Sequence, residues 1–413
     1  MRFCMITTFY PPYSFGGDGV FVKQLSNELA RRGHEVEIVC CQDAYNLLAG
    51  GKRLKPIHDQ DHPRVTVHSL KSPWGFLSPL ATHQSGRPIL KSSKIKKILQ
   101  RPFDVIHYHN VSLIGGPAIL QYGEAVKVYT LHEYWLICPT HLLFKFNRKI
   151  CARRHCLPCV LTHRRPPQVW RYTDAIAEAV NHVNIFIAPS TFSKKTHLQM
   201  GLKIPIIELP HFSARWDSHE QSAELSTAEA PYFLFVGRLE KIKGLQEVLP
   251  LFRQYQRAQL RIVGAGDYEP VLRRLAKDVP NIQFLGYRSG EELGLLYKHA
   301  VATIVPSLWH EVFGMVILES FAQRTPVIVR NRGGMPQLVK ESGGGFVFDT
   351  TAELLSAMER LLENPSLRQR IGMFGYEAFR SKWGAEVHIA RYLNIVSGAM
   401  AERLDKRTPE NAS

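Results

Sequence analysis

The stretch ATIVPSLWHEVFGMVILESFAQRTPVIV, residues 302–329, decides how this chain folds. It opens with a short apolar run, ATIV, and closes with a second one, TPVIV, each of the length of a buried strand. Between the two runs, the sequence from Gly314 onward, including VILESFAQ, is typical of a helix. A strand, a helix and a second strand in this order predict parallel strands joined by a crossover helix.

This stretch carries two glutamates in different local settings. Glu311 lies in the expected loop after the first strand, and Glu319 lies one or two turns inside the expected helix. The backbone N–H groups of residues 313–316 would form a helix N-terminus, which attracts phosphate or sugar oxygens. Apolar neighbours flank Glu319, where an unpaired carboxylate would be costly. The spacing therefore predicts two carboxylates that span one nucleotide sugar, with Glu311 on a sugar hydroxyl and Glu319 on the ribose diol.

Strand and helix patterns alternate on both sides of a polar segment, residues 213–231. At 413 residues the chain is long enough for two domains. The alternation predicts an α/β protein with two Rossmann-like domains, whose parallel sheets face a central cleft. We expect an N-terminal domain over residues 1–213 and a C-terminal domain over residues 214–388. Residues 389–413 are expected to form a helix that crosses back to the N-terminal domain, followed by a tail.

The apolar runs and the cysteines indicate a cytoplasmic protein. No apolar run reaches the roughly 18 residues that a membrane-spanning helix needs. The N-terminus, MRFCMITTFYPPY, is typical of a buried strand rather than of a signal peptide. The number of cysteines is 7, which is odd and fits a reducing compartment better than a disulfide framework. Cys4, Cys40 and Cys41 lie in strand-like runs and are expected to be inert core residues.

The positive charge is concentrated in the first half. Residues 1–215 hold 28 Lys and Arg against 13 Asp and Glu, whereas the remainder holds 24 against 23, so the net charges are +15 and +1. Residues 87–101 and 145–171 contain basic residues and no acidic one. A solvated surface, docking on anionic lipid and nucleic-acid binding all remain open.

Cysteines gather in a basic insert at about residues 138–171. The spacings between its four cysteines are 12, 4 and 2 residues. Four thiolates can close a structural zinc site, but the first spacing is irregular for a zinc ribbon. A zinc site, plain thiols and a redox disulfide therefore remain open. The cysteines are Cys138, Cys151, Cys156 and Cys159, and the histidines able to replace one of them are His141, His155 and His163.

Several strand ends of the second half offer ligand-binding groups. Arg238 and Lys243 follow a strand directly, where two fixed cations can hold a diphosphate without a metal. Gly264 and Gly286 follow two other strands and let the backbone approach a flat nucleobase. Each of these signals is weak alone, because a glycine after a strand is usually only a turn.

Taken in order, the segments resemble a known family. GRLEKIKG, GAGDYEP, FLGY, PSLWHEVFGMVILESFAQRTPVI and NRGGMPQLV look like the C-terminal domain of the family-4 retaining glycosyltransferases, which have the GT-B fold. Glu311 and Glu319 match the Glu-x7-Glu signature of that family. FYPPYSFGGDGVFVKQLSNELARRGHEV and FDVIHYHNVSLIGG extend the resemblance to the N-terminal half.

The resemblance implies roles for individual residues. Arg238 and Lys243 would neutralise the leaving diphosphate, and Glu311 and His132 would lie at the donor sugar, which makes these four the catalytic set. The donor-binding set that it implies is Gly16, Gly17, Arg238, Lys243, Gly264, Gly286, Tyr287, Phe313, Gly314, Met315 and Glu319.

The resemblance also implies a reaction. A sugar would pass from a nucleoside-diphosphate sugar to a glycan or lipid-linked acceptor, with retention at the anomeric carbon and no cofactor for catalysis. The pathway it suggests is the biosynthesis of cell-surface polysaccharide or lipopolysaccharide. A GT-B epimerase or phosphorylase, or a basic nucleic-acid-binding protein, are the rival interpretations. They explain the glutamates and the Arg238 and Lys243 pair less well, and we expect no nucleic-acid partner.

The charge of the first half predicts a membrane partner. We expect peripheral association with the inner face of the plasma membrane, because the excess charge lies in the half expected to bind the acceptor. SSKIKKILQ, residues 92–100, interleaves Lys94, Lys96 and Lys97 with apolar residues and is the expected contact, with an ordinary surface helix as the alternative. Residues 43–64 and 71–93 are expected to be variable loops that hold acceptor residues.

Overall fold

The computed structural model describes residues 1–49, 60–214 and 230–405, with side chains as far as 403. The chain divides into two compact units. Unit 1 comprises Met1–Phe146, Cys151–Pro210 and His388–Ser413, and unit 2 comprises Asn147–Ile150 and His211–Val387. Most of the expected linker, part of the expected loop at 43–64 and the expected tail from residue 406 lie outside the described residues.

Unit 1 is built on a parallel sheet of seven strands in the order β3-β2-β1-β4-β5-β8-β9. Phe3 of the central strand β1 pairs with Val36 on one side and with Val105 on the other. The order confirms the expected doubly wound α/β class. The strands are β1 (Arg2–Ile6), β2 (Glu35–Cys41), β3 (Val65–Leu70), β4 (Val105–Tyr108), β5 (Val126–Thr130), β8 (Ile185–Ala188) and β9 (Ile206–Glu208).

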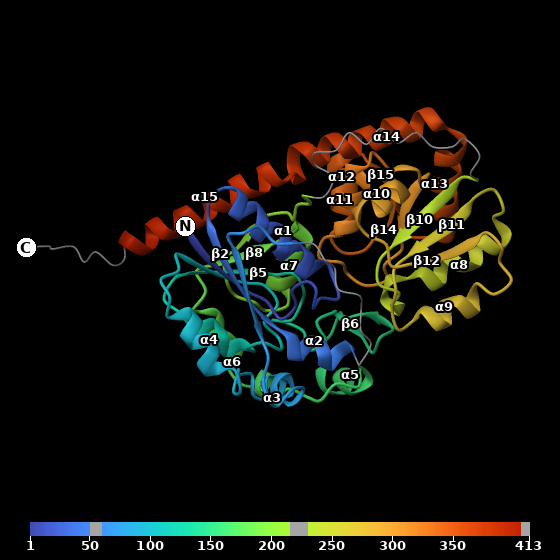
Figure 1. The fold of residues 1–413 in the computed structure, drawn as a ribbon. Coiled ribbons are helices and arrows are strands. Elements are labelled where there is room, and N and C mark those ends of the chain that lie inside the picture. Colours follow the sequence, from blue (N-terminus) through green and yellow to red (C-terminus); the bar gives the residue numbers. More distant parts are fainter. Residues whose placement is uncertain (50–59, 215–229, 406–413) are drawn as a thin grey trace, which may run out of the picture. The chain divides into compact units, whose positions relative to one another are not determined.

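One face of this sheet is covered by α1 (Gly17–Arg31) and by part of α15 (Ala385–Asp405), as Figure 1 shows. Apolar residues recur along α1 at the spacing of one helical face, and Phe21, Leu25 and Leu29 are buried. After α1, Gly33 and His34 donate backbone hydrogen bonds to Ala30 and Leu29, which closes the helix as a Schellman motif.

The segment between β2 and β4 is more ordered than the sequence predicted. The expected loop at 43–64 begins with α2 (Gln42–Ala49), and the expected loop at 71–93 contains α3 (Leu77–Ser85). Both loop predictions are therefore wrong in part. The cause is that α3 has no clean apolar face: Leu77 and Leu80 are exposed, so helical periodicity gave no signal.

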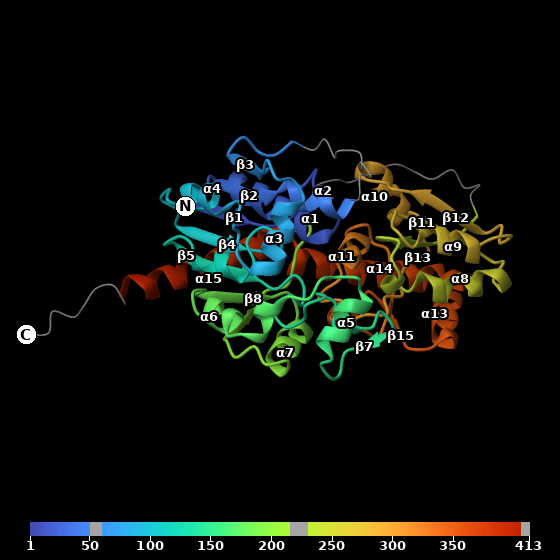
Figure 2. The ribbon, with the colours of Figure 1, turned by 90° about the horizontal axis from the view of Figure 1, so that it is seen from below.

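The basic segment at 92–100 forms α4 (Ser92–Leu99), which lies near α3 in both ribbon views (Figures 1 and 2). Its apolar residues Ile95, Ile98 and Leu99 are buried in unit 1. They are therefore not available to insert into a lipid surface. This part of the membrane prediction is wrong, because the apolar face of α4 packs against protein. The lysines of the helix remain exposed.

The rest of unit 1 and the cysteine-bearing insert consist of short elements. Cys4, Cys40 and Cys41 are buried in β1 and β2, as expected. The short elements are β6 (Phe144–Lys145), β7 (Lys149–Ile150), α5 (Cys156–Thr162), α6 (Ala175–Val180), α7 (Thr191–Gln199), and the 3-10 turns η1 (Pro117–Gln121) and η2 (Val169–Tyr172).

Unit 2 is built on a parallel sheet of six strands in the order β12-β11-β10-β13-β14-β15. Phe233 of β10 pairs with Leu260 of β11 and with Ala302 of β13. Residues 302–329 fold as predicted, into β13 (Ala302–Val305), α11 (Met315–Ala322) and β14 (Val327–Arg330). The strands are β10 (Tyr232–Val236), β11 (Gln259–Val263), β12 (Ile282–Gly286), β13 (Ala302–Val305), β14 (Val327–Arg330) and β15 (Gly345–Phe348).

Helices cover both faces of this sheet (Figure 1). The larger core lies between the sheet and α8 (Leu245–Gln254), α9 (Glu269–Leu275) and α13 (Thr351–Glu363). On the other face, Leu293 and Tyr297 of α10 (Gly290–Lys298) pack on Tyr232 and Leu234. The remaining elements are η3 (Lys241–Lys243), α12 (Met335–Ser342), α14 (Pro365–Ala378) and a π-helical turn at Phe379–Trp383. Within the residues that the structure describes, no helix is both long and apolar enough to cross a bilayer.

Candidate active site

The loops that follow the strands of unit 2 meet along one edge of its sheet. The Gly264 N–H after β11 donates to the Gly286 carbonyl at the end of β12 over 2.8 Å. A Cβ atom at Gly264, where φ is +133°, would stand 1.9 Å from the Gly237 carbonyl oxygen after β10. Only glycine permits this approach. The structure therefore brings two predicted donor-binding residues, Gly264 and Gly286, beside the loop that carries Arg238.

The centre of this edge is an ion pair between Lys243 and Glu311. Lys243 Nζ lies 2.6 Å from Glu311 Oε1, and the two side chains are only 20% and 12% exposed. Ser307 Oγ donates to the same carboxylate oxygen over 2.8 Å. The Lys243 ammonium also lies 5.6 Å from the centre of the Trp309 ring. Two residues that the sequence assigned to catalysis are thus in direct contact.

The charge state of Glu311 follows from this contact. Burial by itself would raise the pKa of Glu311, but the charge of Lys243 opposes it. Hydrogen bonds from Lys243, Ser307 and Trp309 add to that effect, and the pKa of the carboxyl ends below its ordinary value. Glu311 is therefore a carboxylate at neutral pH, held against a positive charge.

Backbone contacts hold the loop of Glu311 from both sides. The Leu308 N–H donates to the Ile242 carbonyl over 2.8 Å, which ties this loop to the turn that carries Lys243. The Gly334 N–H donates to the Glu311 carbonyl over 2.7 Å. A Cβ atom at Gly333, where φ is +66°, would stand 2.1 Å from that carbonyl oxygen. The loops after β10, β13 and β14 are thus locked together around the ion pair.

Glu319 occupies the fifth position of α11 and has a partner that sequence reasoning missed. The Tyr297 hydroxyl of α10 donates to Glu319 Oε2 over 2.9 Å. The glutamate is 8% exposed, so this hydrogen bond offsets part of the cost of burying its carboxylate. The helix begins after Gly314, close to the predicted start, with Phe313 buried before it and Met315 half-buried at its first position.

Arg238 does not join the ion pair of Lys243. Its guanidinium lies 2.7 Å from Glu240, and the two side chains are 46% and 32% exposed. Tyr287, another predicted donor-binding residue, is 56% exposed after β12. Arg238 and Lys243, the two cations predicted to hold the diphosphate, therefore each pair with a different glutamate.

The edge of the unit 1 sheet holds histidines. A hydrogen bond of 2.9 Å joins His132 Nε2 to His109 Nδ1, and the edge of the Phe21 ring faces His132 at 5.2 Å. Burial lowers the pKa of His132 to about 3, although the residue as a whole is only partly buried. His132 is therefore neutral at pH 7, so it acts there as a hydrogen-bonding group rather than as a cation.

Two further histidines extend this group. His107 hydrogen-bonds to the Tyr392 hydroxyl over 3.0 Å and to the Thr130 hydroxyl over 2.8 Å. Burial lowers the pKa of His107 well below its usual value and that of His388 to about 3. His109 and His132 follow strands of the sheet, whereas His107 lies within β4 and His388 lies on α15.

Gly16 and Gly17 stand at the start of α1. Gly16 is extended and precedes the helix, and Gly17 is its first residue. The resemblance assigned both to the donor-binding set, and the structure places one directly before the helix and the other at its first position. Because α1 begins here without a side-chain cap, its first N–H groups are available to an anionic ligand.

The four cysteines of the insert lie in unit 1 but are not arranged as a metal site. Phe146 N–H donates to Cys159 Sγ over 3.3 Å, and Cys138 Sγ lies 3.3 Å from the Thr140 hydroxyl. Burial, followed by the neighbouring thiols, raises the pKa of Cys151. No three metal-ligating side chains gather closely enough to hold an ion anywhere in the described part of the chain. The structural zinc site stays a prediction.

Some residues of the site had no role in the sequence prediction. Ser307 and Trp309 lie inside the decisive stretch, and their position directly after β13 could have marked them. His109 follows a strand in the same way. Tyr297 gave no signal, because it lies on a different helix 22 positions before Glu319.

Comparison with known proteins covers the whole of this architecture. The model described as Glycosyltransferase Family 4 matches residues 15–211, and the model described as Glycosyl transferases group 1 matches residues 217–378. The D-inositol 3-phosphate glycosyltransferase of Corynebacterium diphtheriae is 30% identical, over 93% of this chain and 92% of that protein.

Solved structures share the fold at low sequence identity. Sucrose-phosphate synthase from Thermosynechococcus elongatus has a TM-score of 0.73 at 17% identity, covering 97% of this chain and 100% of that one. HepE of Anabaena, solved with UDP-glucose, has a TM-score of 0.64 at 16% identity, covering 98% and 100%. WaaG, a glycosyltransferase of lipopolysaccharide biosynthesis, has a TM-score of 0.61 at 12% identity, covering 96% and 100%. With both halves matched and a relative aligned over nearly its full length, this chain belongs to the family 4 and group 1 glycosyltransferases of the GT-B fold.

Proposed function

We propose that this glycosyltransferase transfers a sugar from a nucleoside-diphosphate sugar to a glycan or lipid-linked acceptor, with retention at the anomeric carbon and without a catalytic metal. The observation that carries the proposal is the ion pair of Lys243 and Glu311 at the edge of the unit 2 sheet. Open α/β sheets bind their ligands at this edge.

The ion pair suggests how the donor engages the site. A diphosphate is a stronger partner for Lys243 than a single carboxylate, because it carries more charge and more acceptor oxygens. When the diphosphate takes the ammonium, Glu311 is released to accept a hydrogen bond from a donor sugar hydroxyl. Arg238, which is exposed and paired only with Glu240 among the described carboxylates, can swing to the same diphosphate at low cost.

The start of α11 supports the placement of the nucleotide. Backbone N–H groups of Gly314, Met315 and the next residue face the helix N-terminus, where partial positive charge favours phosphate or sugar oxygens. Glu319 lies one turn further along the helix, with its carboxylate oriented by Tyr297. We assign the ribose hydroxyls to Glu319.

We assign the reaction a front-face route. The departing diphosphate takes the proton of the acceptor hydroxyl as the new glycosidic bond forms on the face that the diphosphate leaves. Lys243, Arg238 and the N-terminus of α11 stabilise the charge that develops on the diphosphate. Glu311 positions the sugar ring.

The acceptor proposal rests on the charge and surface of unit 1. Exposed apolar side chains concentrate between residues 74 and 90, on and beside α3. Trp74 is 62% exposed and Phe76 is 58% exposed, whereas the apolar face of α4 is buried. No acidic residue occurs between His62 and Phe103. Exposed aromatic residues among basic ones suit an anionic bilayer surface, so we propose that unit 1 docks there to reach a lipid-linked acceptor of cell-surface polysaccharide or lipopolysaccharide synthesis.

A nucleotide-release assay tests the proposed donor. Purified enzyme is incubated with UDP-glucose, which the related HepE structure holds, and with GDP- and ADP-sugars, with and without acceptor lipids. Release of nucleotide from at least one donor, and an NMR product with the anomeric configuration of that donor, are expected. Inversion at the anomeric carbon would refute the retaining mechanism.

Sedimentation with vesicles tests the docking surface. Phe76→Ser should weaken binding to anionic vesicles, whereas Phe374→Ser, which removes a phenylalanine of unit 2 that is 45% exposed, should not. Equal binding of both variants would remove the assignment of residues 74–90 to the membrane and leave the transferase assignment intact.

A further inference from the structure

We propose that a basic pocket between β3 and α4 of unit 1 binds a phosphate group, as a site separate from the donor site. The pocket has a volume of about 520 Å³. Its lining comes from the end of β3 and from α4 with the residues that follow it. The lining residues are His68, Ser69, Leu70, Lys71, Lys94, Lys97, Ile98 and Arg101.

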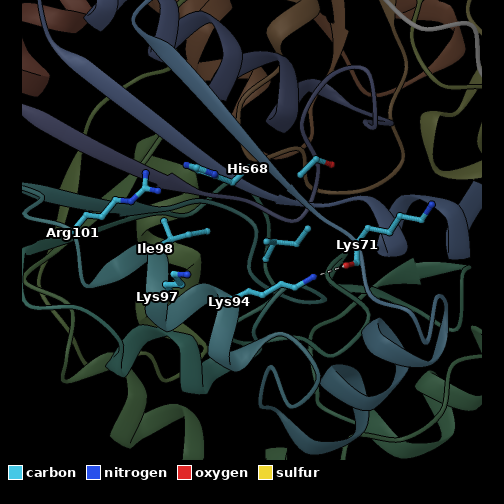
Figure 3. Close-up of a pocket in the computed structure, with 8 residues that line it drawn as sticks. His68, Lys71, Lys94, Lys97, Ile98 and Arg101 are labelled. Carbon is cyan, nitrogen blue, oxygen red and sulfur yellow. Dashed lines mark hydrogen bonds between the residues drawn. The ribbon is translucent and has the colours of Figure 1, made fainter.

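The pocket has an apolar floor and a cationic rim. Leu70 and Ile98 are nearly buried, whereas Lys71, Lys94 and Lys97 are exposed. Figure 3 shows Lys94 reaching from α4 towards the backbone of Lys71, with a hydrogen bond of 3.1 Å from its Nζ to the Lys71 carbonyl. This contact links the two walls of the pocket and leaves the ammonium charge of Lys94 without a counter-charge.

The basic side chains of the pocket fall into two groups. Arg101 and His68 both contact Glu37, at 2.5 Å and 2.7 Å, so both are already paired with its carboxylate. Lys71, Lys94 and Lys97 face no carboxylate within ion-pair distance among the residues that the structure describes. The first group supports the wall, and Lys94 and Lys97 of the second group are the side chains that a ligand would engage.

Two lysines of α4 without a paired carboxylate in the described part of the chain, Lys94 and Lys97, favour an anion with several acceptor oxygens, whereas the Lys71 side chain points away from them in Figure 3. A phosphate monoester or a diphosphate carries a charge near −2 or more and several acceptor oxygens. Lysine is a flexible point charge with three donors, which suits phosphate oxygens in varied positions. A single carboxylate would neutralise only one of the two lysines. The phosphate can belong to a soluble phosphorylated compound or to a lipid headgroup, and both sources present the same chemistry.

The neighbouring Lys96 provides a matched control. It lies on the same helix, next to Lys97, and is equally exposed, but its ammonium lies 5.0 Å from the centre of the Tyr122 ring and it does not line the pocket. Diffuse attraction between a basic surface and an anion depends on both lysines alike. A pocket depends on Lys97 and not on Lys96.

Calorimetric titration with inorganic pyrophosphate tests the pocket. It is carried out in the Lys243→Ala background, so that binding at the unit 2 edge contributes little. Lys97→Gln should weaken binding about 10-fold, while Lys96→Gln should change it less than 2-fold. Equal losses in the two variants, or no loss in Lys97→Gln, would overturn the proposal. Both side chains are exposed, so neither substitution disturbs the fold.

Vesicles distinguish the two sources of phosphate. The same variants are sedimented with vesicles of phosphatidylcholine alone or with added phosphatidic acid, whose headgroup is a phosphate monoester. A loss of phosphatidic acid binding that is confined to Lys97→Gln assigns the pocket to a lipid headgroup. Unchanged vesicle binding together with weaker pyrophosphate binding assigns it to a soluble ligand. Vesicle and pyrophosphate binding that depend equally on Lys96 and Lys97 would show diffuse attraction and refute the pocket. The outcome is independent of nucleotide release, which tests the donor site.

Discussion

The two units place different chemistry at the same position of the same architecture. Each is a parallel sheet with polar residues after its strands, as open α/β sheets generally have. In unit 2 these residues form an ion pair, with a lysine and a glutamate 2.6 Å apart. In unit 1 the polar residue after β5 is His132, which burial holds neutral and which hydrogen-bonds to His109 after β4. The architecture therefore supplies the position, and the local packing decides whether that position carries charge.

The difference has a chemical consequence. In unit 2, Lys243 can exchange Glu311 for an anionic ligand, because the lysine keeps its charge when its contact with the glutamate breaks. A neutral edge offers hydrogen bonds of fixed direction and does not change its charge near pH 7. Unit 2 thus suits a diphosphate, and unit 1 suits the hydroxyls of a sugar.

The largest expected effect comes from substituting the charged residues of the unit 2 site. Lys243→Ala and Glu319→Ala should each lower the transfer rate by about 100-fold or more, because each removes a contact to the donor. Initial rates of nucleotide release measure the loss. Lys243→Ala also leaves Glu311 buried without its partner, so the double variant Lys243→Ala/Glu311→Gln serves as the control for stability. Rates within 3-fold of wild type in a folded single variant would remove the site assignment.

The second prediction is that a fall in pH destabilises unit 1 before it destabilises unit 2. Within the described part of unit 1, burial lowers the pKa of these histidines: His34, His83, His107, His132, His141, His163, His197 and His388. An unfolded histidine takes up its proton at about pH 6.5. The stability that neutral histidines provide is therefore present above about pH 6.5 and is lost as the pH falls below it.

In unit 2, the pKa of Glu311 is lowered, so its contribution is present above the ordinary carboxylate value and is lost only below it. Burial also lowers the pKa of His310 in unit 2, to about 4. Hydrogen exchange compared at pH 7.5 and pH 5, after correction for intrinsic rates, should show unit 1 losing protection first. Simultaneous loss in both units would contradict this difference.

A smaller effect is expected from the residue that orients Glu319. Tyr297→Phe removes one hydrogen bond, worth about 1 kcal/mol, and should raise KM for the donor about 5-fold while changing kcat little. Leu293→Ala in the same helix is the matched control, since it alters packing without touching Glu319. A change in kcat alone would indicate that Tyr297 acts on the reacting atoms instead.

The smallest expected effect is that of removing divalent metal. If Lys243, Arg238 and the N-terminus of α11 hold the diphosphate, activity should change less than 2-fold in EDTA. Rates are measured before and after chelation, with magnesium and manganese added back to separate portions. Strict dependence on either ion would contradict the metal-free proposal.

The sequence by itself determined the local elements and the order of the loops. Strands and helices of both sheets follow from apolar periodicity, which reports how each segment lies against a core. The resemblance in residues 302–329 and in the glycine-bearing loops indicated the family. It also placed Lys243 and Glu311 in one site, although they are 68 positions apart.

Only the tertiary structure decided the partners. It showed that Ile95, Ile98 and Leu99 of α4 pack inward. It also showed that Tyr297 hydrogen-bonds to Glu319 and that His109 hydrogen-bonds to His132. Periodicity identifies an apolar face but not what covers it, because that depends on segments distant in the chain. The charge states followed in the same way, since the pKa of a histidine depends on its burial and on its neighbours, and both arise only when the strands assemble into a sheet.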